Sequence, residues 1–345
     1  MKDTFLDANF PRTSDGRVYH LGLRSGEVAN RILTVGSPSR AETISLLLDE
    51  SASVKNSRCL LKLSSERGFL TITGHFNGTP VSIISIGMGY PNMDFFVREV
   101  RECVDGEMVI VRLGSCGGLT EGLSVGSLVI PAGSVSIRRN YDYDFTEVST
   151  SENANKNAYQ ISKTVMADAE LSSNLADRLI NAPPPKSQLV IKTGSINASA
   201  DSFYSSQGRQ TSFPDHNETL IDDLIAQVPN IATLEMETFH LFHLAASWRP
   251  KLLQERESHG PVVPPTKLPV EPSIEASPST TLPISPSANN KPGPKDGQVR
   301  GIRAAAVQMV FANRRTREFI SPDVVRDLEA WSGRVVLEAL CSVPL

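Results

Sequence analysis

Four short segments of the sequence combine residue types that bind anions or polar rings. The first covers residues 34–40, reads Thr-Val-Gly-Ser-Pro-Ser-Arg, and changes from a strand pattern to a helix pattern. A helix N-terminus presents unpaired N–H groups and a positive dipole end, so Gly36 and Arg40 indicate an anion such as phosphate. An arginine in the first turn is unfavourable for the helix itself, which also points to a nearby anion. The alternative is an ordinary turn with a solvated Arg40.

The second segment, residues 109–118, places an arginine at the end of an apolar strand and follows it with glycines. A buried Arg112 is costly unless it is paired or faces an anion, and the glycines after it allow the backbone to approach a ligand closely. The hydroxyl of Ser115 adds a hydrogen-bonding group. Neither the Walker pattern nor a Gly-x-Gly-x-x-Gly fingerprint is present, so nucleoside triphosphates and dinucleotides are poorly supported. The alternative is a structural Arg112 in a salt bridge.

The third segment, residues 203–209, joins an aromatic ring to an amide and a guanidinium. Gln207 offers a donor and an acceptor, Arg209 offers a fork of donors, and Phe203 offers a ring for stacking. A planar ring with alternating carbonyls and N–H groups, such as uracil, needs that combination. The alternative is a polar surface loop.

The fourth segment, residues 234–238, opens a helix with two carboxylates around a methionine. Glu235 and Glu237 are able to accept hydrogen bonds from vicinal sugar hydroxyls, with Met236 as an apolar floor, although helix dipoles favour carboxylates at this position in any case. His240 and His243 follow at helical spacing. No third ligand has a matching spacing, so we predict no metal site.

The composition bounds the class of protein. The chain has 345 residues, of which 40% are hydrophobic, enough for one large domain or two ordinary ones. The net charge of −4 gives no reason to expect nucleic acid or an anionic membrane as a partner. No apolar run reaches the length of a membrane-spanning helix, and the first residues lack a secretory signal. The four cysteines contain no Cys-x-x-Cys pair, so we expect reduced thiols in a cytoplasmic protein.

The remaining pattern alternates apolar strands with helices, which predicts an α/β domain with helices packed on a sheet. The expected strands cover residues 32–35, 81–86, 108–113, 128–130, 189–192 and 302–310. Ser37-Pro38 and Ser321-Pro322 each predict a helix start. Residues 250–299 hold 11 of the 23 prolines and no aromatic residue, so we predict a disordered insertion within one domain spanning 1–345.

Taken together, these segments resemble nucleoside phosphorylase family I, and within it the branch that acts on uridine. The resemblance runs from about residue 17 to 248 and resumes from 301 to 345. The segments that carry it are VYHLGLR (18–24), TVGSPSR (34–40), residues 67–80, SIGMGYPN (85–92), VRLGSCGGL (111–119), ADSFYSSQGRQ (200–210) and TLEMET (233–238). The fold that the resemblance implies is a three-layer αβα sandwich with a mixed central β-sheet.

The resemblance implies phosphorolysis of uridine to uracil and ribose 1-phosphate, with phosphate as co-substrate and no cofactor. The residues that match phosphate ligands are Gly36, Arg40, Arg67, Arg112 and Ser115. Those that match ribose ligands are His20, Glu235, Met236 and Glu237. The base pocket matches Phe203, Gln207, Arg209 and one of Arg314 and Arg315, with Arg314 as our choice. Of these, Arg112, Gln207, Arg209 and Glu237 are the expected catalytic residues.

The family likeness also implies an assembly of identical subunits. Arg67 and His20 match residues that act on a neighbouring subunit's site, so we expect a homodimer or homohexamer with shared sites. Gly68 stands where bacterial members carry a glutamate that helps to bind potassium, so the likeness does not extend to that site. Three other readings stay open: a purine nucleoside phosphorylase, which would carry an aspartate near Asn313, a nucleosidase, and a non-catalytic nucleoside-binding relative.

Overall fold

The computed structural model describes residues 4–50, 60–146, 158–185, 189–248 and 301–345. The predicted insertion at 250–299 and Cys59 lie outside these residues. Cys103, Cys116 and Cys341 are free thiols. Within the described ranges, no helix has the length and apolar character needed to cross a membrane.

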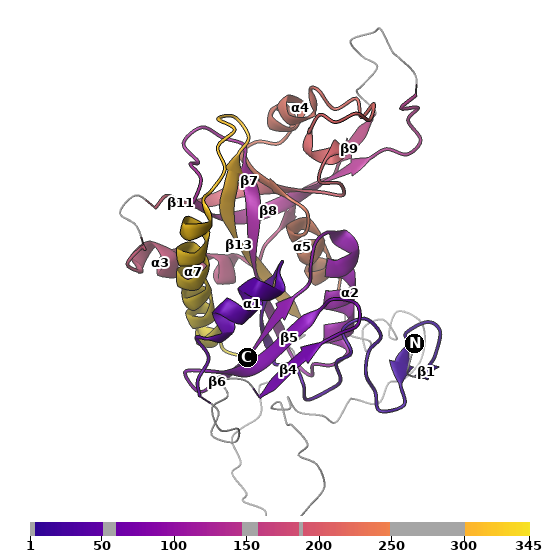
Figure 1. Ribbon diagram of the computed structural model, residues 1–345, viewed down its shortest axis with the longest axis vertical. Helices are drawn as coiled ribbons and strands as arrows, with labels where there is room; N and C mark the ends of the chain where they lie inside the picture. Colours follow the sequence, from indigo (N-terminus) through magenta and orange to yellow (C-terminus); the bar gives the residue numbers. More distant parts are fainter. Residues whose placement is uncertain (1–3, 51–59, 147–157, 186–188, 249–300) are drawn as a thin grey trace, which may run out of the picture.

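A large mixed sheet forms the centre of the molecule (Figure 1), and it contains eleven strands within the described residues. The path through neighbouring strands runs β10-β8-β11-β12-β7-β3-β6-β5-β4. The strands are β3 (Arg31–Val35), β4 (Leu61–Ser64), β5 (Leu70–Phe76), β6 (Thr79–Ser85), β7 (Met108–Gly118), β8 (Leu128–Arg139), β9 (Tyr159–Ile161), β10 (Val165–Met166), β11 (Ile191–Ala200), β12 (Ile231–Glu235) and β13 (Ile302–Asn313). Two short strands, β1 (Phe5–Leu6) and β2 (Arg12–Thr13), pair separately.

Alternate side chains of the central strands enter two different hydrophobic cores. Val109 and Val111 of β7 contribute to one core, whereas Ile110 between them contributes to the other. Leu33 and Ile32 of β3 divide in the same way. Because successive side chains of a strand point to opposite faces, the sheet is covered on both sides.

Helices form the two outer layers. The first core includes side chains of α1 (Pro38–Ser45), α3 (Ala169–Asn181) and α7 (Pro322–Ser342), and the second includes side chains of α2 (Tyr90–Arg101) and α5 (Thr238–Ser247). A further helix, α4 (Leu220–Gln227), packs in a smaller core with β11 and β12, and a short 3-10 turn, η2, spans Ser205–Gln207. The predicted αβα arrangement with a mixed central sheet is confirmed.

Both predicted helix starts are also confirmed. Helix α1 begins at Pro38, and the hydroxyl of Ser37 accepts a hydrogen bond from the Arg40 N–H at 3.3 Å. Helix α7 begins at Pro322, although the Ser321 side chain makes no cap hydrogen bond. Proline at the first helical position fits both starts because its fixed backbone angle suits a helix and its missing N–H is not needed there.

Strand β7 is longer than predicted. We expected Arg112 to close this strand, but β7 continues through the glycines to Gly118, with β13 beside it in parallel as far as Asn313. Strand β13 also pairs with β8, so β7, β13, β8, β11 and β12 form a closed circuit of hydrogen-bonded neighbours. The expectation for Arg112 was wrong because the glycines are paired on both edges: β13 runs parallel on one side, and β12 pairs antiparallel with Gly117 and Gly118 on the other, which keeps the backbone extended.

Helix α7 approaches α1 closely at Gly333, which leads to a test of the packing. A Cβ at this position would stand 2.7 Å from Cγ1 of the buried Ile44. Alanine favours a helix by about 1 kcal/mol over glycine, but overpacking a core costs about 1–3 kcal/mol. We therefore expect Gly333→Ala to lower the free energy of unfolding by about 1 kcal/mol in urea denaturation. Gly301→Ala, where no atom of the described residues lies within 4 Å of the added Cβ, is the control. Equal or greater stability of Gly333→Ala would contradict this packing.

Candidate active site

A cavity of about 190 Å³ gathers most of the predicted site residues. It lies where β7 and the ends of β12 and β13 meet the turns after β3 and β6 and the start of α5. The predicted residues that line it are Gly36, Arg40, Arg112, Ser115, Phe203, Gln207, Arg209, Glu235, Met236 and Glu237. Four separate segments of the sequence therefore converge on one hollow.

Arg112 is the most constrained side chain of this cavity, since it is only 4% exposed. Its Nη2 donates to Oε2 of Glu237 at 2.5 Å, and its Nε lies 3.8 Å from Oε2 of Glu235. Within the described part of the chain, its buried Nε and Nη1 atoms have no hydrogen-bond partner. Buried polar groups are normally paired, so two unpaired guanidinium nitrogens on a residue that lines the cavity fit an oxyanion ligand.

Arg40 reaches the same cavity from α1. Its Nε donates to Oε1 of Glu329 at 2.7 Å, and its Nη1 donates to the carbonyl of Leu113 at 3.2 Å. Burial lowers the pKa of the Arg40 guanidinium, and the Glu329 carboxylate partly offsets this effect. The positive charge of Arg112 also lowers the pKa of Arg40, so the two guanidinium groups act on each other. Two like charges held together in a buried place are favoured when an anion lies between them.

Glu237 is held between two donors. Its Oε1 accepts from the N–H of Gly89 at 2.6 Å, and its Oε2 accepts from Arg112. Gly89 has a φ of 89°, a left-handed conformation that glycine adopts without strain, and this turns its N–H toward the carboxylate. Burial raises the pKa of Glu237, and the Arg112 guanidinium opposes the shift. A carboxylate has four lone-pair sites, so Glu237 keeps capacity for further donors.

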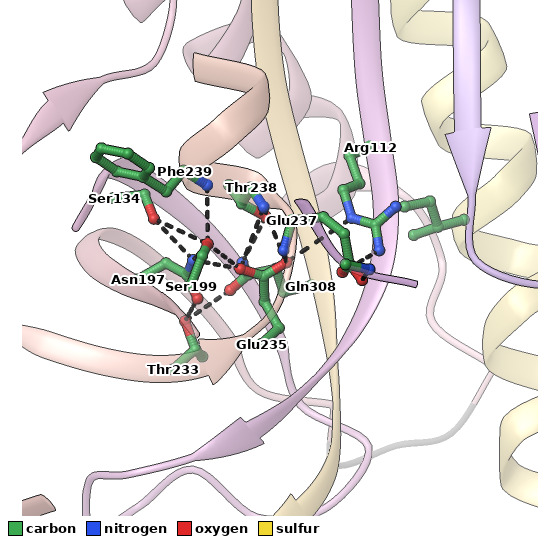
Figure 2. Close-up of polar contacts among 12 residues, drawn as sticks. Arg112, Ser134, Asn197, Ser199, Thr233, Glu235, Glu237, Thr238, Phe239 and Gln308 are labelled. Carbon is green, nitrogen blue, oxygen red and sulfur yellow. Dashed lines mark hydrogen bonds and ion pairs between the residues drawn. The ribbon is translucent and has the colours of Figure 1, made fainter. Parts of the chain in front are cut away.

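Glu235 has a different environment from Glu237, as Figure 2 shows. Its carboxylate accepts hydrogen bonds from the Ser199 hydroxyl, from the Asn197 amide at 2.8 Å and from the N–H groups of Glu237 and Thr238 at 2.9 and 3.0 Å. Four donors satisfy a carboxylate. Although Glu235 borders the cavity, its hydrogen bonds are used to fix the start of α5, which sets the position of Met236 and Glu237.

The loop over residues 203–209, called the base loop below, is buried at Ser205, Ser206 and Gln207, whereas Phe203 and Tyr204 are exposed. Gln207 is only 3% exposed, and its Oε1 accepts from Nη1 of Arg209 at 2.5 Å. The Arg209 guanidinium lies 3.8 Å from the centre of the Phe203 ring. Burial, together with the positive charge of Arg314, lowers the pKa of Arg209 to about 10. The amide NH₂ of Gln207 has no hydrogen-bond partner within the described residues, so it is available to a ligand carbonyl.

The two arginines after β13 diverge. Arg314 borders a wider hollow of about 600 Å³ that shares Phe203 and Arg209 with the cavity, and its Nη2 lies 3.4 Å from the carbonyl of Gly208. Arg315 instead donates to the carbonyl of Leu119. Arg314 is therefore the arginine beside the base loop.

His20 and Arg67 are not in the cavity with Arg112. They line a separate cavity of about 200 Å³ together with Tyr19. His20 Nδ1 lies 2.6 Å from Oε1 of Glu99, and its ring stacks on Phe95 at 3.7 Å, while Arg67 donates to the Tyr19 hydroxyl at 2.5 Å. The expectation that both residues act in a neighbouring subunit's site stays a prediction.

A comparison with models of known protein families shows which family the chain belongs to. The model of the phosphorylase superfamily matches residues 30–249. The chain belongs to this superfamily. The nucleoside phosphorylase resemblance seen in the sequence is therefore confirmed, and the cavity is the candidate active site of a nucleoside phosphorylase.

Several known relatives align with most of this chain. A uridine phosphorylase of Thermococcus kodakarensis is 29% identical over 248 residues, which cover 71% of this chain and 78% of that protein. A DeoD-type purine nucleoside phosphorylase of Oceanobacillus iheyensis is 26% identical, with coverage of 66% and 81%. A structure solved in a study of two uridine phosphorylases of the oomycete Phytophthora capsici is 35% identical, with a TM-score of 0.75 and coverage of 99% and 100%.

A more distant solved structure shows the same fold. The nucleoside phosphorylase of Trypanosoma brucei, described as having uridine phosphorylase activity, is 21% identical, with a TM-score of 0.63 and coverage of 97% of this chain and 100% of that chain. Both pyrimidine and purine enzymes are thus found among the relatives, so the family alone does not fix the base.

Sequence reasoning missed the residues of the phosphorylase that hold the site residues in place. Asn197 and Ser199 hold Glu235, Glu99 holds His20, and Glu329 holds Arg40. None of them belongs to a segment with a chemical pattern of its own. Asn197 and Ser199 lie beyond the strand predicted at 189–192, in the part of β11 that the apolar pattern did not identify.

The Glu235 network allows a direct test. Asn197 donates to one oxygen of the Glu235 carboxylate, and the N–H groups of Glu237 and Thr238 donate to the other. In Glu235→Gln, an NH₂ group replaces one of these oxygens, so in either orientation of the amide a donor faces a donor and a hydrogen bond is lost. We expect Glu235→Gln to lower the free energy of unfolding by about 1–3 kcal/mol in urea denaturation. The control is Glu121→Gln, since the Glu121 side chain is 87% exposed. Equal stability of both variants would show that Glu235 does not anchor this network.

Proposed function

We propose that this phosphorylase cleaves uridine with inorganic phosphate, giving uracil and ribose 1-phosphate. The observation that carries the proposal is the buried Arg112, which has two guanidinium nitrogens without a partner among the described residues and lines the same cavity as Gln207. Phosphate supplies the oxyanion that these donors lack, and a pyrimidine supplies the ring that fits beside the amide.

The phosphate subsite of this proposal consists of Gly36, Arg40, Arg112 and Ser115. Charge-assisted hydrogen bonds from guanidinium groups position a dianion and leave one oxygen free to react. Glu237 and Met236 take the ribose. Both oxygens of Glu237 are anchored, which presents the remaining lone pairs in a fixed direction to the sugar hydroxyls. Glu235 supports this subsite through the backbone that it caps.

The base subsite consists of Phe203, Gln207 and Arg209, with Arg314 at its outer edge. The Gln207 NH₂ donates to a uracil carbonyl, and its oxygen has a second lone pair for the ring N–H beside the one used by Arg209. Phe203 provides a face for stacking. This alternation of donor and acceptor matches uracil.

The reaction follows from the placement of charge. One phosphate oxygen bonds to C1′ of the ribose with inversion, the bond from C1′ to the base nitrogen breaks, and its electron pair leaves with uracil. Positive charge develops on the ribose next to the phosphate, and negative charge develops on the base next to Arg209. Donors that are held in place before the reaction stabilise such developing charge.

The completed site takes His20 and Arg67 from a second copy of the chain. In this proposal a dimer or a larger assembly supplies them, which is consistent with the separate cavity that they line in this chain. His20 is oriented for this role because Glu99 occupies its Nδ1 and leaves Nε2 for the 5′-hydroxyl of the ribose.

One observation disfavours the purine alternative. A purine enzyme would use an aspartate near position 313 to protonate the base. Here Asn313 Nδ2 donates to the carbonyl of Leu123, and its Oδ1 accepts from the N–H groups of Arg315 and Thr316. This side chain is committed to holding a turn.

The first functional prediction concerns dependence on phosphate. Purified protein with uridine and phosphate should release uracil and ribose 1-phosphate, because the site uses phosphate as the nucleophile. Replacement of phosphate by a non-reactive salt at equal ionic strength should abolish release, measured by absorbance or chromatography. Inosine should react at least about tenfold more slowly, because a purine base leaves the polar groups of the base subsite without their hydrogen-bond partners. Equal release in water would indicate a nucleosidase, and a preference for inosine would indicate a purine enzyme.

The second functional prediction uses the neighbouring arginines after β13. Arg314→Ala removes a cation beside the base loop, so kcat/KM for uridine should fall about tenfold or more in steady-state assays. Arg315→Ala is the matched control, because its guanidinium points to Leu119, and it should stay within about twofold of the unmodified protein. A larger fall in kcat/KM for Arg315→Ala than for Arg314→Ala would contradict the assignment of Arg314 to the base subsite.

A further inference from the structure

The contact between α1 and α7 places a carboxylate behind the proposed phosphate subsite. Ile44 and Gly333 touch across the two helices, and Arg40 and Glu329 each lie four residues earlier on the same helix faces. The Arg40–Glu329 ion pair of 2.7 Å is therefore one turn from the close contact. Both side chains are largely buried, with exposures of 7% and 13%.

Two of the three nitrogen atoms of the Arg40 guanidinium make hydrogen bonds to other parts of the protein. Nε is held by Glu329, and Nη1 is held by the carbonyl of Leu113 in β7, which lies beside Val35 at the end of β3. Nη2 has no hydrogen bond to any described residue, and Arg40 lines the cavity beside Gly36 and Ser115. Because a guanidinium is planar, fixing Nε and Nη1 also fixes the direction of Nη2.

We propose that Glu329 is a positioning residue for phosphate: it holds Arg40 so that Nη2 points into the phosphate subsite. The proposal rests on the function proposed above and assigns a part of it to the C-terminal helix. Glu329 itself does not touch the substrate. It acts only through Arg40.

The charge of Glu329 distinguishes positioning from simple electrostatic attraction. A carboxylate behind the subsite lowers the local positive potential and by itself weakens the binding of an anion. Its favourable contribution therefore lies in its place as a hydrogen-bond acceptor. The acceptor and the charge can be separated by two conservative substitutions at this position.

The test compares Glu329→Asp with Glu329→Gln. Aspartate keeps the charge but withdraws the carboxylate by about 1.5 Å, whereas glutamine keeps an acceptor at the same reach and removes the charge. Asp327→Asn is the matched control for the charge change, since Asp327 is exposed on the same helix. KM for phosphate and KM for uridine are measured separately with each variant.

We expect Glu329→Asp to raise KM for phosphate about tenfold and to change KM for uridine by less than about twofold, while Glu329→Gln and Asp327→Asn stay within about threefold for both substrates. The proposal is overturned if Glu329→Asp leaves KM for phosphate unchanged. It is also overturned if Glu329→Gln raises this KM as much as Glu329→Asp does, or if both substrates are affected equally.

A second measurement does not depend on catalysis. Inorganic phosphate should raise the midpoint of thermal unfolding of the unmodified protein, because a ligand that binds the folded state stabilises it. The rise should be smaller for Glu329→Asp and preserved for Glu329→Gln. An equal rise in all three proteins would overturn the role of Glu329. Absence of uridine cleavage with this pattern of midpoints intact would instead contradict only the proposed reaction.

Discussion

The guanidinium of Arg112 is buried with two nitrogens that have no partner among the described residues, and the groups around it are arranged so that these nitrogens stay unpaired. Arg112 has two carboxylates within reach, and either could occupy its free N–H groups if it were mobile. Neither is mobile. Four donors hold Glu235, and the Gly89 N–H holds the second oxygen of Glu237. The negative charges therefore compensate the burial of Arg112 without filling its remaining donors, which cost about 1–3 kcal/mol when they stay unpaired.

The closed circuit of strands explains how this arrangement is maintained. Ser134, Asn197, Thr233 and Gln308 come from β8, β11, β12 and β13, and their side chains form one buried network with Glu235 (Figure 2). A carboxylate is stable in the interior only when such donors surround it. The circuit brings four strands close enough to supply them, so the polar interior of the sheet is what places the start of α5 against Arg112.

The features predictable from the sequence are local ones. Ser37 and Pro38 determine the start of α1 by themselves, and the apolar runs of β3 and β6 identify buried strands. Strands β5 and β12 were not predicted, because Thr71, Thr73 and Thr233 interrupt their apolar pattern although all three are fully buried. The backbone and neighbouring side chains pair the hydroxyls of Thr73 and Thr233, and that pairing depends on residues far along the chain.

The same distinction applies to the site. The segments that carry Arg112, Gln207 and Glu237 were predictable because each combines chemically active residue types over a few positions. The anchors were not, since Glu329 is 289 residues from Arg40 and no local pattern links them. His20 and Arg67 show a further limit on what the sequence of one chain predicts. In this chain they line a cavity other than that of Arg112, so if they act on the same nucleoside they act from another copy. Such a site is a property of an assembly, and the pattern of one chain supplies its parts without their arrangement.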